Sequence, residues 1–423
     1  MSSHSGAAQA LSGHALAGGT ITLRHALLAD GSIVDIHVVD GVVDRVGSPA
    51  SDHLTDGDAT TTIDLDGMLV LAAFAEPHAH LDKAFLAETV PNPSGDLMGA
   101  IMAMEAHRHL LTLDDTIERA DRAVRLMLSN GVTAIRTHAD CTVEHGLMSV
   151  EALIAVRERF RGRVHIEVCV LNGWPSTGPE GADQRALLRD AISLGVDLIG
   201  GCPHLESMPE AATDQFLELA DAAGLGVDLH TDETLDPTVL ALEHLAHRVL
   251  DSGFALPVTA SHCVSLGMQP ERRQREVAEL VSAAGIDVVA LPHTNLFLQG
   301  RGHAAPTPRG LTAVAALRAA GVNVVAGADN LQDPFNPVGR GDPLETAGLM
   351  IMASHLLPAE AADAVSEGVR ATMRLAASGP RAGAVADLVA LPSGSVREAI
   401  AMGPSGRIVF SAGRIVHDGR TLR

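Results

Sequence analysis

Two histidines spaced two residues apart, His78 and His80, end an apolar run that begins at Met68. On a β-strand, residues i and i+2 point to the same face, so both imidazoles could converge on one ion. The chain has 21 histidines, so one such pair could arise by chance. The value of the pair as half of a metal site therefore depends on further ligands downstream.

Three further polar clusters each end a short β-like run. They supply His230 with Glu233, then His262, and finally Asp329. Imidazole nitrogens and carboxylate oxygens suit a borderline divalent cation such as zinc or ferrous iron. The sequence therefore predicts a metal site with a divalent ion as cofactor.

The composition restricts the class of protein and its partners. A chain of 423 residues, 46% of them hydrophobic, can bury a large core and suits one large domain with a smaller one. The formal charge of −22 argues against nucleic acid or an anionic membrane surface as a partner and favours a small neutral or cationic substrate. Residues 1–19 lack a basic start and an apolar core, so we expect a disordered lead and a cytoplasmic protein.

Lys83 is the only lysine among 30 basic residues. A bias towards arginine explains most of this usage. The position of Lys83, three residues after His80, has two interpretations. The first is that an ammonium is required there, either to pair with Asp82 or to face the substrate. The second is that this lysine survives by chance.

Short β-branched runs alternate with longer amphipathic stretches through the middle of the chain. This alternation is typical of a closed parallel (β/α)8 barrel of the TIM type, an α/β fold. The helical stretches are 112–129, 184–193, 211–223, 270–284 and 311–320. The eight expected strands are 69–75, 132–137, 164–171, 196–200, 226–229, 257–260, 286–291 and 323–326.

The clusters of polar residues end runs one, five, six and eight, at the face where such barrels build their active sites. A closed barrel also places strand eight beside strand one, which would bring Asp329 to His78. Outside the barrel, alternating residues and Asp-Gly turns predict a small antiparallel β-sandwich built from both chain ends. We therefore divide the chain into a lead (1–19), a composite β-sandwich domain (20–66 and 384–423) and a barrel (67–383), with joints near 56–58 and 378–383.

Several motifs together resemble the amidohydrolase superfamily, specifically its cytosine deaminase-like branch. The matching stretches are 76–83, 136–140, 203–206, 230–233, 259–262, 298–301, 329–339 and 386–389. The resemblance implies one iron or zinc ion bound by four residues, namely His78, His80, His230 and Asp329. Binuclear members carry a carboxylated lysine at the end of strand four, and 196–206 contains no lysine.

The resemblance departs from cytosine deaminases in the loops that contact substrate. The glutamine expected after strand three is missing, the second aspartate is Asn330, and an expected tryptophan is Phe335. Asp329 followed by Asn330, in place of two aspartates, is more similar to the N-isopropylammelide amidohydrolases, which remove alkylamines from triazine rings. The predicted substrate contacts are Asn172, Trp174, Gln299, Asn330, Asp333 and Phe335.

The predicted reaction is hydrolytic deamination of a small nitrogen heterocycle, such as a cytosine-like ring, isocytosine, creatinine or an aminotriazine. A bound cation lowers the pKa of its water towards neutrality. His262 and Asp329 are expected to hold and deprotonate this water, while Glu233 carries a proton to a ring nitrogen.

Other interpretations stay open. Release of an alkylamine, ring opening of a cyclic amide, or a barrel that only binds a partner are alternatives, and assembly into a homo-oligomer is undecided. His230 with Glu233 could merely cap a helix, and His262 could be a core histidine. Four further residues could either support the metal ligands or contact the substrate, and we expect support: His138, Asp140, His204 and Glu206.

Overall fold

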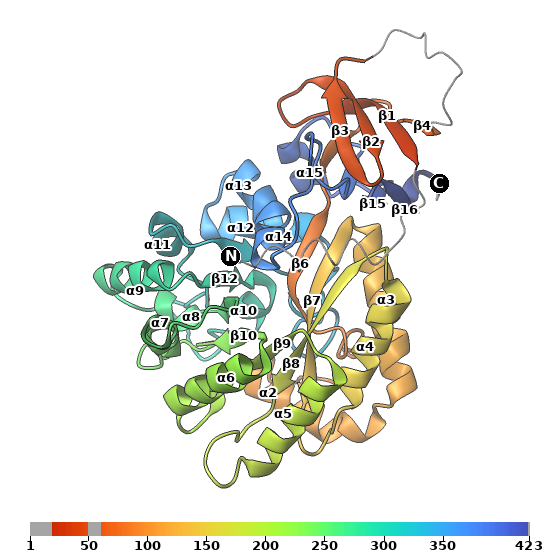
Figure 1. The fold of residues 1–423 in the computed structure, drawn as a ribbon. Coiled ribbons are helices and arrows are strands. Elements are labelled where there is room, and N and C mark those ends of the chain that lie inside the picture. The colour runs from red at the N-terminus through yellow and green to blue at the C-terminus, as the bar shows by residue number, and fades with distance from the viewer. Residues whose placement is uncertain (1–18, 50–60, 422–423) are drawn as a thin grey trace.

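The computed structural model describes residues 19–49 and 61–421, which form two sheets and the helices around them (Figure 1). Of the lead predicted at 1–19, only Gly19 lies within these ranges. The joint predicted at 56–58 lies outside the described residues.

One of the two eight-stranded sheets is wholly parallel, and each of its strands pairs with its neighbour in chain order. A parallel bridge between Ala79 and Asp329 joins the first strand to the end of the last. The predicted (β/α)8 barrel is therefore confirmed. Its strands are β6 (Phe74–Ala79), β7 (Val132–Cys141), β8 (His165–Asn172), β9 (Leu198–Gly201), β10 (Gly226–Thr231), β11 (Val258–His262), β12 (Asp287–Ala290) and β13 (Val324–Ala326).

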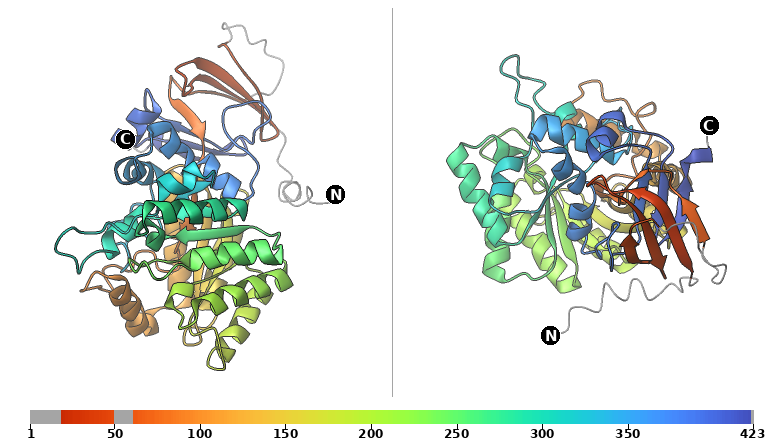
Figure 2. Two further views of the ribbon diagram at one scale, coloured as in Figure 1. Left: turned by 90° about the vertical axis from the view of Figure 1, so that its left-hand side faces the viewer. Right: turned by 90° about the horizontal axis from the view of Figure 1, so that it is seen from above.

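Helices between the strands form the outer layer of the barrel (Figure 2). Local chemistry sets their ends. Thr112 caps α3 through a hydrogen bond from the backbone N–H of Asp115, and α5, α6 and α7 end at left-handed glycines. The helices are α2 (Leu97–His107), η1 (Arg108–Leu110), α3 (Leu113–Ser129), α4 (Met148–Phe160), α5 (Ala182–Leu194), η2 (Pro203–Leu205), α6 (Pro209–Ala223), α7 (Ala241–Ser252), α8 (Val264–Gly267), α9 (Glu271–Ala283), α10 (Pro292–Leu298), α11 (Val314–Ala319), α12 (Pro343–Ser354), α13 (Pro358–Asp363) and α14 (Glu367–Thr372).

The second sheet joins both ends of the chain and lies at one end of the barrel (Figures 1 and 2). Its strand order is β16-β15-β14-β5-β1-β2-β3, with β4 beside β1. Asp40 and Gly41, both with positive φ, form the predicted turn between β2 and β3. The elements are β1 (Thr20–Leu27), β2 (Ile33–Val39), β3 (Val42–Gly47), β4 (Thr61–Asp64), β5 (Leu69–Ala72), β14 (Leu388–Leu391), α15 (Val396–Met402), β15 (Ile408–Ser411), β16 (Arg414–Asp418) and η3 (Gly419–Thr421).

Two details of the sheets differ from expectation. The second sheet is mixed rather than purely antiparallel, because β4 and β5 both pair with β1 in parallel. The run 69–75, expected as one barrel strand, is divided: β5 pairs with β14 in the second sheet, and the first barrel strand begins at Phe74. Both parts are buried, so an apolar run alone cannot show which sheet each part joins. The division into domains stays a proposal.

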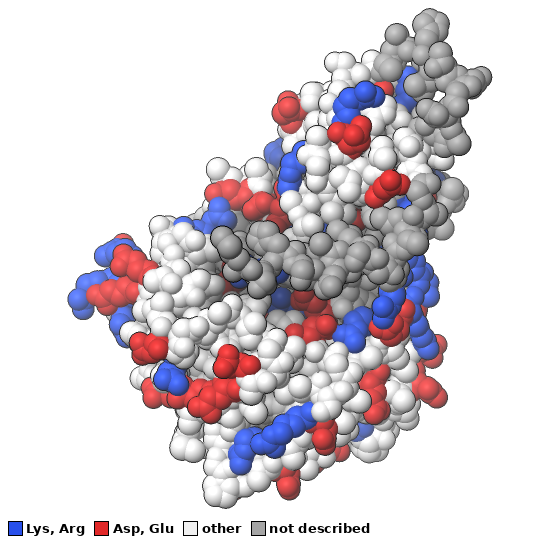
Figure 3. Space-filling model, in the orientation of Figure 1, with Lys and Arg blue, Asp and Glu red and all other residues white. Residues whose placement is uncertain are grey.

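Two further observations concern the charges on the surface and the character of the helices. On the face drawn in Figure 3, acidic and basic side chains of the described residues are interspersed rather than gathered by sign. Within 19–49 and 61–421, no helix combines the length and apolar character needed to cross a membrane.

Gly200 in β9 gives a test of the close packing inside the barrel. A Cβ atom at this position would lie 2.8 Å from the carbonyl oxygen of Asp228 and 2.8 Å from the Sγ atom of Cys169. We expect Gly200→Ala to lower the free energy of unfolding by about 1–3 kcal/mol, because backbone on the neighbouring strand would have to move. Chemical denaturation followed by circular dichroism measures the change.

Gly47→Ala is the matched control, because a Cβ atom at Gly47 meets nothing within 4 Å. Equal denaturation midpoints for the two variants would contradict the packing argument.

Candidate active site

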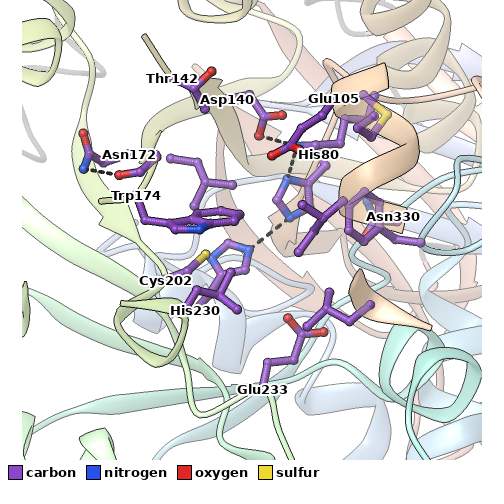
Figure 4. A pocket seen from close by; sticks show the side chains of 18 of the residues that line it. His80, Glu105, Asp140, Thr142, Asn172, Trp174, Cys202, His230, Glu233 and Asn330 are labelled. Carbon is purple, nitrogen blue, oxygen red and sulfur yellow. Dashed lines mark hydrogen bonds and ion pairs between the residues drawn. The ribbon is translucent and has the colours of Figure 1, made fainter. Parts of the chain in front are cut away.

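Four predicted metal ligands meet at one end of the barrel. His78 lies on β6, His80 follows it, His230 lies on β10 and Asp329 follows β13. The Nε2 atom of His230 lies 3.2 Å from Nε2 of His78 and 3.2 Å from Nε2 of His80. The Oδ1 atom of Asp329 lies 3.3 Å from Nε2 of His80 and 3.7 Å from Nε2 of His78. Figure 4 shows the rings of His80 and His230 side by side, joined by the dashed line of their contact.

This cluster fits a divalent metal ion. Tetrahedral bonds of about 2.0–2.1 Å to nitrogen and oxygen place neighbouring ligand atoms about 3.3 Å apart, close to the separations in this cluster. Both oxygens of Asp329 are buried without a partner of good hydrogen-bond geometry. Burial and the neighbouring imidazoles hold the pKa of His78 and of His230 well below the ordinary histidine value, which keeps both rings neutral. Neutral imidazole is the form that binds a metal.

A buried polar network orients His78. Its Nδ1 lies 2.9 Å from the Oγ atom of Ser261, and this hydroxyl donates to Asp228 at 2.8 Å. Arg136 in turn donates to Asp228 at 2.9 Å. The chain of contacts leaves Nε2 of His78 free to face the ligand cluster, which is the arrangement expected behind a metal-bound histidine.

The four residues expected to support the ligands do so to different degrees. His204 contacts the carbonyl oxygen of His230 through Nδ1 at 3.0 Å. The ring of His138 lies 4.0 Å from that of His78, between centroids, and neither of its nitrogens has a hydrogen-bond partner. Asp140 accepts from Lys83 at 2.6 Å. Glu206 accepts instead from the backbone N–H of Ser176, away from the four ligands.

Glu233 and His262, the two other predicted catalytic residues, lie beside the ligand cluster. The Oε1 atom of Glu233 lies 3.6 Å from Nδ1 of His262, which contacts Asn295 at 3.0 Å. Nε2 of His262 is buried without a partner. Burial, reinforced by the charge of Asp329, raises the pKa of Glu233 well above its ordinary value. The site therefore holds a carboxyl that favours its protonated form beside an imidazole nitrogen with a free lone pair.

The backbone is strained at or just after the ends of three barrel strands, β10, β11 and β13. Asp232, His262 and Asp329 have φ values of 53°, 70° and 62°, in the left-handed region that non-glycine residues rarely adopt. The backbone N–H of Asp329 donates to the carbonyl oxygen of His78 at 3.1 Å. Strain of this kind persists only where surrounding contacts impose it, and it concentrates at functional sites.

A cavity of about 370 Å³ opens in front of the ligand cluster. Four predicted substrate contacts line it: Asn172, Trp174, Asn330 and Phe335. Trp174 is 37% exposed and lies at the cavity with Asn172 in Figure 4. The amide oxygen of Asn172 already accepts from Gln184, so this side chain also holds its loop.

Gln299 and Asp333 are not among the residues that line the cavity. Gln299 donates to the backbone carbonyl of Glu233 at 3.2 Å. Asp333 accepts from the side chain of Asn330 and from the backbone N–H of Phe335. Both side chains therefore support loops around the cavity.

Sequence reasoning missed one wall of the cavity. It is formed by α2 and the residue after it, through Leu97, Ile101, Met104, Glu105 and Arg108. A signal for this helix was present, because the Asp96 side chain accepts from the N–H of Gly99 and caps an apolar run. Asn295, the partner of His262, had no comparable signal, because its position depends on packing between distant strands.

Comparisons with known proteins found similarity over most of the chain. The model of the Amidohydrolase family matches residues 87–417. The chain is 33% identical to a pterin deaminase from Rhizobium rhizogenes over 90% of its length and 87% of that protein. Among solved structures, 5-methylcytosine deaminase from Klebsiella pneumoniae superposes with a TM-score of 0.85 at 29% identity, covering 94% of this chain and 97% of that one. N-isopropylammelide isopropylaminohydrolase from Burkholderia multivorans superposes with a TM-score of 0.81 at 28% identity, covering 95% and 99%.

Metal binding can be tested through Asp329. We expect Asp329→Ala to lower the affinity for zinc or ferrous iron by more than about tenfold. Loss of a residue that only hydrogen-bonds to a metal ligand already costs about that much. Elemental analysis after dialysis against a graded series of chelator measures the affinity. Gln299→Ala is the control, since Gln299 does not line the cavity. Equal metal retention by the two variants would exclude Asp329 as a ligand.

Proposed function

Because this chain belongs to the amidohydrolase family, we propose that it hydrolytically deaminates a small amino-substituted nitrogen heterocycle. This membership confirms the family resemblance that the sequence motifs indicated. It also confirms the predicted enzyme class, a hydrolase of non-peptide C–N bonds. One observation supports the proposal most directly: a buried carboxyl, Glu233, and a buried imidazole, His262, lie beside a cluster of metal-ligand type at one cavity. This is the set of groups that proton transfer during hydrolysis requires.

One divalent ion, zinc or ferrous iron, would be held by four residues: His78, His80, His230 and Asp329. When bound, such an ion supplies positive charge that lowers the pKa of water and yields a nucleophile at neutral pH. The histidines contribute neutral nitrogens, and the carboxylate of Asp329 offsets part of the charge of the ion.

The proton transfers fall to Glu233, His262 and Asp329. The protonated carboxyl of Glu233 donates to the ring nitrogen beside the amino-bearing carbon, which makes that carbon more electrophilic. His262 or Asp329 accepts a proton from the attacking water as its oxygen bonds to this carbon. The accepted proton then passes to the exocyclic nitrogen, and the C–N bond breaks as ammonia leaves. The remaining hydroxyl proton returns to the carboxylate of Glu233. The product is the corresponding oxo heterocycle.

The cavity favours a substrate larger than one small ring. Its volume of about 370 Å³ lies in the range typical of pockets for drug-sized ligands. Trp174 and Phe335 provide aromatic surfaces on which a flat ring system can stack. The similarity to a pterin deaminase supports a bicyclic aminoheterocycle of the pterin type as the first candidate.

Removal of an alkylamine is the second candidate. Leu97, Ile101 and Met104 give the α2 wall of the cavity an apolar surface that would accommodate an alkyl group. The structural similarity to N-isopropylammelide isopropylaminohydrolase supports the same candidate.

Mass spectrometry of products separates the two candidates. We expect zinc- or iron-loaded protein to exchange an amino group for oxygen on pterin, with cytosine, isocytosine, creatinine and N-isopropylammelide tested in parallel. Asp329→Ala should give no product, because it lacks a proposed ligand and proton acceptor. Loss of isopropylamine alone would favour the second candidate, and addition of water without loss of nitrogen would contradict both.

Glu233→Gln tests the proton transfer. We expect kcat to fall by about two to four orders of magnitude, because the amide cannot carry a proton to the ring nitrogen. The bound metal should be retained, since Glu233 is outside the proposed ligand set. Steady-state kinetics with elemental analysis measure both quantities, and an unchanged kcat would remove Glu233 from the mechanism.

A further inference from the structure

Lys83, the single lysine of the chain, is buried at the metal end of the cavity. Its side chain is 6% exposed and lines the cavity. Its Nζ atom donates to Oδ1 of Asp140 at 2.6 Å and lies 3.2 Å from Nδ1 of His80. Burial of a cation is costly unless it is paired, and the carboxylate of Asp140 provides this pairing.

Among the described residues, this ammonium has one acceptor at hydrogen-bond distance. An ammonium carries three donors, and the carboxylate of Asp140 accepts one of them. Nδ1 of His80 accepts none in the proposed metal site, because it carries the ring proton when Nε2 faces the ion. The next acid, Asp82, keeps its Oδ1 atom 3.6 Å away, and this oxygen has no hydrogen-bond partner. The other oxygen of Asp82 accepts from the backbone N–H of Asp140 at 2.9 Å, which holds the carboxylate in place. At least one donor of Lys83 is therefore available to a molecule in the cavity.

The position of Lys83 determines which part of a substrate it would meet. Arg108, the other cation that lines the cavity, follows α2 and donates to the hydroxyl of Thr142. Lys83 instead contacts His80, one of the proposed metal ligands. The heterocycle itself must lie at this end of the cavity, because the carbon that reacts has to approach the ligand cluster.

We propose that Lys83 determines substrate specificity by donating a hydrogen bond to an oxo oxygen on the ring of the heterocycle. This inference rests on the proposed deaminase function and narrows its substrates to rings that carry both an amino group and an oxo group. An ammonium has no acceptor, so it discriminates against an amino substituent at the same position. A buried donor left unpaired by the wrong substrate gives strong discrimination. Asp140 acts as a positioning residue that holds the ammonium in place.

Matched substrate pairs, in which one member has the oxo group and the other lacks it, test the inference. The pairs are pterin with 2-aminopteridine, isocytosine with 2-aminopyrimidine, and cytosine with 4-aminopyrimidine. For each pair, kcat/KM is measured on the metal-loaded protein and on Lys83→Met, with metal content determined for both. Calorimetric binding of the same pairs to Glu233→Gln, with and without Lys83→Met, provides a second measurement that needs no turnover.

We expect the parent protein to prefer the oxo member of at least one pair, and Lys83→Met to reduce that preference at least about tenfold. Lys83→Gln should retain part of the preference, because an amide still donates a hydrogen bond. If Lys83→Met weakens both members of a pair by the same factor, Lys83 only positions His80 and the inference is overturned.

The outcomes also separate this inference from the proposed function. Deamination with a preference that does not depend on Lys83 overturns the inference alone. Binding with a preference that depends on Lys83 but without turnover supports the inference and contradicts the deaminase function. If no compound binds or reacts, both fail.

Discussion

Closure of the barrel between its first and last strands is the constraint on which the site depends. His78 and Asp329 are about 250 positions apart in sequence, and the backbone hydrogen bond between them sets their side chains at one end of the barrel. Glu76 reinforces the junction, because its carboxyl accepts from the backbone N–H of His78 and of Ala328. Without this junction the imidazoles of His78 and His80 would not face Asp329, and the cluster would lose the one oxygen ligand proposed for it.

Charged groups in the barrel interior lose their contacts with water, and contacts between opposite charges compensate for part of this loss. Arg136 lies between Glu167 and Asp228, with donor–acceptor distances of 2.8 and 2.9 Å. Each of these three charges thus has an opposite charge at hydrogen-bond distance, which limits the desolvation penalty. The same network continues through Ser261 to His78, so the groups that stabilise the interior also orient a proposed metal ligand.

Much of the fold could be predicted because each strand end carries its own local signal. Alternating runs located the eight barrel strands, and polar residues at their ends located the ligand cluster. The division of 69–75 between two sheets could not be predicted, since β5 and the start of β6 are equally apolar and differ only in distant partners, β14 and β7. The roles of Gln299 and Asp333 depend in the same way on tertiary contacts, because each has a loop partner that no sequence pattern specifies.

The electrostatics of the site assign different tasks to two of its carboxyls. Glu233 and Asp329 are both buried, and burial by itself raises the pKa of each. The facing imidazoles of His80 and His262 outweigh burial at Asp329 and hold its pKa below the ordinary value, whereas Glu233 gains a further rise from the charge of Asp329. Environments that push two pKa values apart assign one group as proton donor and the other as anion. Asp329 is thereby suited to a cation and Glu233 to a ring nitrogen, and the ionised state of the first favours the protonated state of the second.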